Sequence, residues 1–130
     1  HALTLRVHDT MQGARRGMFA GLRPQILRSA ASVPANIAEG CGKPTRDDFL
    51  RYLSNACGSL AELESHLELA RDLRAIDRPH HEEIVELLTE VRRMLLAMIR
   101  TLRSRPDPKR GGRAEAAAST KRTVPEPEAS

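Results

Sequence analysis

One apolar repeat constrains the fold of this chain more than any other feature. From residue 49 to residue 70, apolar side chains recur in alternating steps of four and three: Phe49, Leu53, Ala56, Leu60, Leu63, Leu67 and Ala70. This spacing is the a/d heptad seam of helices that pack side by side. Gly58, Ser59 and Glu62 could end one helix and open another, but a loop would shift the heptad phase, and the phase is unchanged. We therefore predict one helix of about 30 residues, roughly 45 Å long, in which Gly58 marks the close approach of another helix.

A second stretch, Ser32–Gly40, places a proline inside a helical pattern. The apolar face around it consists of Leu22, Ile26, Leu27, Ala30, Val33 and Ile37. Pro34 has no N–H, and its ring clashes with the carbonyl group of Ala30, so the helix either restarts at Pro34 or runs through it with a kink. The apolar phase is the same on both sides of Pro34, which favours a continuous, kinked helix.

Two further helical segments flank these stretches. Residues 1–12 place apolar side chains on one side, as in the second part of a first helix, and the glycines of residues 13–17 break it, because each weakens a helix by about 1 kcal/mol. Thr45 is a suitable N-cap for the long helix, and Pro79 suits the first turn of a last helix. The stripe of that last helix again steps by four and three: Ile84, Leu88, Val91, Leu95, Met98 and Leu102.

Beyond the last helix, the apolar pattern ends. Residues 105–130 mix prolines and glycines with Ala, Ser, Lys, Arg and Glu, which is typical of a disordered tail. The cations of this tail could hold RNA or DNA; they are Lys109, Arg110, Arg113, Lys121 and Arg122. A solvated tail with no binding role is an equal alternative.

The composition favours an all-helical, cytoplasmic protein. There is no Trp, one Tyr and two Phe, so Leu, Ile, Val, Met and Ala must fill the core, and their abundance together with Glu and Arg favours helices. No apolar stretch reaches the roughly 20 residues that a membrane-spanning helix needs, and the N-terminus has no signal-peptide pattern. Cys41 and Cys57 have no paired spacing, so we expect free thiols.

Charge is distributed unevenly along the chain. Basic and acidic residues number eight and four in residues 1–60, six and nine in 61–102, and seven and four in 103–130. The total is +4, but the first part and the tail are basic, whereas the centre is acidic. Such polarity favours a polyanionic partner such as nucleic acid, although many proteins with this polarity bind none.

Three segments together resemble a known family. The first is Phe19-x-x-Leu22-x-x-Gln25-x-x-Arg28-x-x-x-Ser32-x-Pro34-Ala35-Asn36-Ile37-Ala38-Glu39-Gly40. The second is Phe49-x-x-Tyr52-Leu53-x-x-Ala56-x-Gly58-Ser59-x-x-Glu62, and the third is Leu67-x-x-Ala70-x-x-Leu73. They look like the small proteins encoded in intervening sequences of bacterial large-subunit ribosomal RNA genes, to which the accessory variability determinant of diversity-generating retroelements is related.

The resemblance implies an antiparallel, up-and-down four-helix bundle over residues 1–104, followed by the tail at 105–130. It also implies assembly into a homopentameric barrel. For the retroelement relative, it implies binding of nucleic acid and of a reverse transcriptase through a basic surface.

Two sets of residues are the candidate sites. The cations expected to contact phosphates are Arg15, Arg16, Arg23, Arg28, Lys43, Arg46 and Arg51. The structural motif comprises Ser32, Pro34, Asn36, Glu39, Gly40, Gly58, Ser59 and Glu62. Within it, we expect the polar side chains of the two helices to meet and fix the helix register.

No residue set in the sequence favours catalysis, a cofactor or a metal. His80 and His81 are adjacent, so they point to different sides of a helix, and no second ligand pair accompanies them. No nucleophile–base pair is visible. We therefore expect a non-enzymatic, oligomeric bundle that binds nucleic acid; the alternative is a protein-interaction scaffold with no role in nucleic-acid binding.

Overall fold

Four α-helices make up the part of the chain that the computed structural model describes, residues 1–13 and 20–106. They are α1 (Ala2–Gly13), α2 (Leu22–Cys41), α3 (Arg46–Asp72) and α4 (Arg78–Ser104). These residues contain no β-strand, so the predicted all-α, four-helix class is confirmed. No helix among them is long and apolar enough to cross a membrane.

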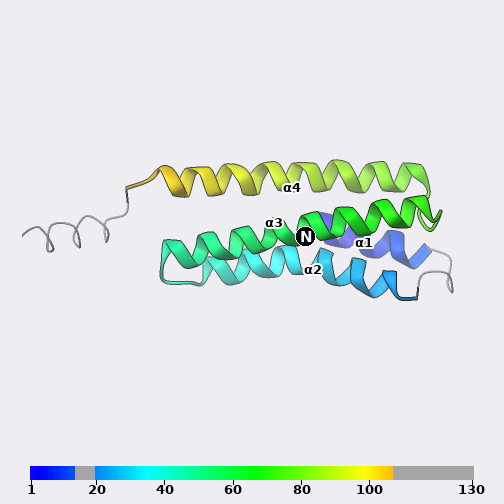
Figure 1. Cartoon of the computed structure of the whole chain (residues 1–130), viewed down its shortest axis with the longest axis horizontal. Coiled ribbons are helices and arrows are strands. Elements are labelled where there is room, and N and C mark those ends of the chain that lie inside the picture. The colour runs from blue at the N-terminus through cyan, green and yellow to red at the C-terminus, as the bar shows by residue number, and fades with distance from the viewer. Residues whose placement is uncertain (14–19, 107–130) are drawn as a thin grey trace, which may run out of the picture.

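The helices alternate in direction along the chain and close into a bundle (Figure 1). Each helix packs on its neighbour in the sequence, and α1 also packs on α4. α3 and α4 have 27 residues each, whereas α1 has 12. α1 therefore lies beside only one half of the bundle, the half in which α3 ends and α4 begins.

The predicted seam of α3 forms the centre of the core. Its leucines are fully buried, and Phe49 at the end of the seam is half-buried. Each buried leucine contributes roughly 1.5–3 kcal/mol through removal of its side chain from water. The seam belongs to one hydrophobic cluster that includes apolar side chains from the other three helices, among them Leu3, Val7, Ile26, Val33, Ile84, Leu88 and Leu95.

Polar caps fix where the two long helices begin. The Thr45 hydroxyl accepts a hydrogen bond from the N–H of Asp48 at 3.2 Å, which confirms the predicted N-cap of α3. At the start of α4, the Asp77 carboxylate accepts one from the N–H of His80 at 3.0 Å. This bond lowers the pKa of Asp77, because it favours the charged form. α2 continues through Pro34, so the helix does not restart there.

Gly40, and not Gly58, is the glycine at which two helices approach closely. A Cβ atom on Gly40 would lie 2.8 Å from the Cβ of Tyr52 and 2.9 Å from Cδ2 of Phe49. Gly58 is exposed, and a Cβ atom there would have nothing within 4 Å among the described residues. The prediction that Gly58 marks a close approach is therefore wrong. Gly58 follows the seam residue Ala56 by two positions, or about 200° around the helix, so it lies on the outer surface of α3.

These two glycines should respond to alanine with opposite signs. Gly40→Ala should destabilise the fold by about 1–3 kcal/mol, because the Cβ of Tyr52 is fixed to the backbone and cannot move aside. Gly58→Ala should stabilise it by up to about 1 kcal/mol through better helix propensity. Urea unfolding followed by circular dichroism measures both, and a shift in the same direction for the two variants would contradict this account of the α2–α3 contact.

His81 is a polar side chain in the core between the end of α3 and the start of α4. It is 6% exposed, and its Nε2 atom has no hydrogen-bond partner among the described residues. Burial lowers the pKa of His81 below its ordinary value of 6.5, and the charge of Arg71 lowers it further. The nearby carboxylates act in the opposite direction, and they are Glu68, Asp72 and Glu82. The neutral imidazole is therefore the form that the folded state accommodates.

We expect the protein to lose stability when the pH falls below about 6.5, since the unfolded chain then binds a proton that folded His81 resists. His81→Leu should reduce this loss. His66→Gln is the matched control, because His66 lies 3.5 Å from the Glu62 carboxylate, on the more exposed side of α3. Unfolding curves measured from pH 8 down to pH 5 test the prediction. An unchanged pH dependence in His81→Leu would show that other groups cause it.

Candidate nucleic-acid interface

The structure separates the cations predicted to contact phosphates into two groups. Arg23 and Arg28 are exposed in the first half of α2, whereas the other described cations lie at the opposite end of the bundle, where α2 ends and α3 begins. These are Lys43, Arg46 and Arg51. Arg15 and Arg16 lie outside the described residues.

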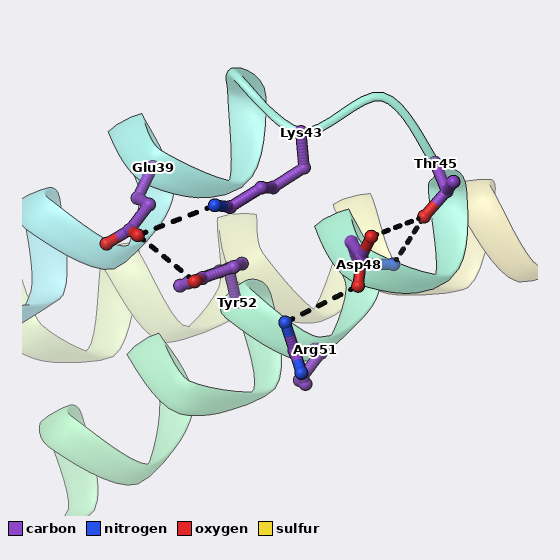
Figure 2. Close-up of polar contacts among 6 residues, drawn as sticks. All are labelled: Glu39, Lys43, Thr45, Asp48, Arg51 and Tyr52. Atoms are coloured by element: carbon purple, nitrogen blue, oxygen red, sulfur yellow. Dashed lines mark hydrogen bonds and ion pairs between the residues drawn. The ribbon is translucent and has the colours of Figure 1, made fainter.

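Lys43 and Arg51 lie beside the Tyr52 side chain, and each has a carboxylate partner (Figure 2). The Tyr52 hydroxyl donates to Oε1 of Glu39 at 3.0 Å, and Lys43 Nζ lies 3.7 Å from the same oxygen. Arg51 lies 3.4 Å from the Asp48 carboxylate. Lys43 and Arg51 also lie 5.2 and 5.4 Å from the Tyr52 ring centroid, within cation–π range. Both cations therefore have a carboxylate partner within the protein, although each ion pair is partly exposed to solvent.

Arg46, at the same end of the bundle, connects the start of α3 to the end of α4. Its Nη1 atom donates to the carbonyl oxygen of Leu102 at 2.9 Å and also to that of Arg105. The last carbonyl groups of a helix have no partner within the helix, so a guanidinium group is a favourable cap for them. Arg46 thus joins the start of α3 to the end of α4, and this role was not predicted from the sequence.

The C-terminal half of α4 holds the cations that sequence analysis missed. Residues 91–106 contain five arginines and no carboxylate. Arg92 donates to Glu64 across the α3–α4 contact. The remaining four are exposed, and their side chains form no ion pair or hydrogen bond within the described chain; they are Arg93, Arg100, Arg103 and Arg105. The sequence does contain a signal for this basic surface, because no acidic residue occurs between Glu90 and Asp107.

Three of these arginines share one face of α4. Around a helix of 3.6 residues per turn, a residue seven positions on returns to within about 20° and a residue ten positions on to within about 80°, so Arg93, Arg100 and Arg103 lie within an arc of about 80° and form a stripe. Arg100 and Arg103 also line a shallow groove with Ile99 and with Leu96, which is 48% exposed. We refer to Arg93, Leu96, Arg100 and Arg103 as the arginine face.

Part of the predicted structural motif lies at the α2–α3 contact. The hydroxyl oxygens of Ser32 and Ser59 are 2.8 Å apart, and Asn36 Nδ2 donates to Oγ of Ser32 at 3.0 Å and to its carbonyl oxygen at 2.8 Å. Glu39 binds Tyr52 instead of Ser59 or Glu62. The expected contact of Glu62 with α2 is replaced by a pair with His66 on α3 itself.

The described residues were compared with the requirements of a metal site and of a reactive thiol. Among them, no three His, Cys, Asp or Glu side chains lie close enough to hold a metal ion. Cys41 and Cys57 are free thiols. Burial raises the pKa of Cys57, and Arg92 only partly opposes this, so Cys57 has little of the thiolate character of a nucleophile.

The structure predicts that Arg46 acts on α4 and not only on its own helix. Arg46→Ala should increase hydrogen exchange in the last turn of α4 and destabilise the fold by about 1–2 kcal/mol, because two carbonyl groups lose their guanidinium donor. Arg51→Ala is the matched control, since its exposed ion pair should contribute less than about 1 kcal/mol. Equal exchange in the two variants would argue against the cap.

Known proteins share both the sequence pattern and the fold described above. Residues 1–97 match the family model described as 23S rRNA-intervening sequence protein. The fold is similar to the crystal structure of a protein with unknown function from the S23 ribosomal protein family of Bacteroides thetaiotaomicron VPI-5482. The two are 29% identical, with a TM-score of 0.70 over 75% of this chain and 92% of the other. No curated protein matches.

Proposed function

Because its match over residues 1–97 shows that this chain belongs to the family of 23S rRNA-intervening sequence proteins, we propose that it is a non-enzymatic helical-bundle protein that binds nucleic acid through a basic surface. The observation that carries the proposal is the arginine face of α4. Guanidinium groups that have no partner among the described residues are suited to phosphate oxygens, which they contact as charge-assisted donors.

The charge of α4 supports this placement. Its first half, residues 78–90, contains four glutamates and one arginine, whereas residues 91–106 contain five arginines and no acidic residue. One helix therefore has an acidic end and a basic end. A polyanion would be attracted to the basic end and repelled from the other, which orients it on the bundle.

The predicted cations contribute unequally to this surface. Arg46 caps α4, and Lys43 and Arg51 have carboxylate partners. Arg23 and Arg28 are exposed, but they lie on the other half of the bundle. We therefore propose the arginine face as the principal contact, with the earlier set as secondary contacts.

We further propose that the protein acts as a homo-oligomer, a homopentamer as the sequence resemblance implies. Exposed apolar side chains at the C-terminal end of α3 and in the second half of α4 support self-association, because the removal of apolar surface from water favours association. Outside the arginine face, they are Leu69, Leu73, Met94 and Met98. A reverse transcriptase of a diversity-generating retroelement is the protein partner that the resemblance suggests.

The same exposed apolar side chains favour a second candidate function, a protein-interaction scaffold. Salt separates the two, because release of counterions weakens phosphate binding steeply as salt rises, whereas apolar docking is not weakened in this way.

Replacing two arginines of the face should weaken nucleic-acid binding in a defined way. Arg100→Gln with Arg103→Gln should lower the affinity of the full chain for a labelled structured RNA by about tenfold or more at low salt. The slope of log affinity against log salt should fall by about 2, because each of the two arginines neutralises one phosphate. Fluorescence anisotropy over a salt series measures both quantities.

The control pair is Arg71→Gln with Arg78→Gln. It removes the same charge from the acidic end, where each arginine has a neighbouring carboxylate, and it should change the affinity by less than about twofold. Equal weakening by both pairs would overturn the arginine face as the site. Absence of binding by the unaltered chain would favour the scaffold. Light scattering on the same samples gives the mass, and a value of 14.4 kDa, that of one chain, would overturn self-association.

A further inference from the structure

The aromatic side chains of the described residues are not placed to stack on bases. Phe49 packs against the core and against Gly40. The Tyr52 hydroxyl is bound to Glu39, and its ring lies beside Lys43 and Arg51. α4 itself has no Phe, Tyr or Trp, and its two histidines lie in its first turn, away from the arginine face. Proteins that bind single strands rely on aromatic stacking for roughly 1–3 kcal/mol per base, and the arginine face contains no Phe, Tyr or Trp side chain that could supply it.

The arginine face is also rigid. It lies within an uninterrupted helix of 27 residues, whose only proline is in the first turn. Two of its buried neighbours, Leu95 and Ile99, anchor this half of α4 in the core, and the Arg46 cap holds its last turn. The stems of the arginines therefore start from fixed positions.

These positions suit the regular backbone of a duplex. Arg100 follows Arg93 by seven positions, or about 10 Å along the helix, and Arg103 follows Arg100 by three positions, or about 4.5 Å. The grooves of B-DNA are roughly 12 and 6 Å wide, so arginines on one helix face can reach phosphates on both sides of a groove. In a single strand, the phosphates have no fixed spacing. The rigid arginine face therefore gains less binding free energy from a single strand than from a duplex.

We infer that the arginine face selects the sugar–phosphate backbone of a double-stranded nucleic acid over a single strand. This inference rests on the proposed function and narrows it to one class of partner. Contacts of this kind position the protein without reading base sequence, so different duplexes of the same form should bind alike.

The test compares the affinities of the full chain for nucleic-acid probes that contain equal numbers of phosphates. Anisotropy is measured with a short RNA duplex, a DNA duplex and an unstructured single strand, at one salt concentration. We expect at least one duplex to bind about tenfold or more tightly than the strand. The two duplexes identify whether the A form or the B form fits better. The preference should shrink to about twofold or less in the variant Arg93→Gln, Arg100→Gln, Arg103→Gln, and remain in Arg71→Gln, Arg78→Gln.

Each result separates the inference from the function on which it rests. Binding of the strand as tightly as the duplexes would overturn the duplex preference and leave nucleic-acid binding in place. A preference that survives the triple substitution would overturn the arginine face as its source. No binding to any probe would overturn the proposed function itself.

Discussion

The apolar seam of α3 is the constraint on which the rest of the structure depends. α3 packs on both α2 and α4, and its seam from Leu53 to Ala70 is completely buried. A seam of this kind fixes how each partner helix is rotated, because a rotation would expose leucines. With this frame set, the α2–α3 contact can close to the point at which only a glycine fits, at Gly40. The paired hydroxyls of Ser32 and Ser59 then fix the register of the two helices.

The fold also decides which cations remain available. At the end of the bundle where α2 meets α3, Lys43 and Arg51 have carboxylate partners, and Arg46 caps α4. Along the last turns of α4, the helix offers its own arginines no carboxylate, because none occurs between Glu90 and Asp107. Guanidinium groups gain free energy from an anionic partner. Where α2 meets α3, anionic or carbonyl partners within the protein already provide this free energy. On the arginine face, an external anion could provide it.

Much of the fold followed from local pattern. The heptad phase predicted α3 as one helix, the apolar phase predicted continuity through Pro34, and Thr45 was predicted as a cap. The errors concern distances between helices. Gly58 was expected at a close contact, which lies instead at Gly40, since the seam places Gly58 on the outer surface. Glu62 was expected to contact α2 and pairs within α3. The candidate site was less predictable, because a list of arginines does not indicate which have partners.

The sequence by itself determined the helical class, the limits of the long helices and the polarity of charge, because periodicity, caps and charge are properties of neighbouring residues. Only the tertiary structure decided which glycine is indispensable, which hydroxyls meet and which arginines are engaged within the described bundle. Those outcomes depend on pairs of residues far apart in the chain, such as Arg46 and Leu102. Their separation in space is set by packing of the whole bundle, and no local pattern encodes it.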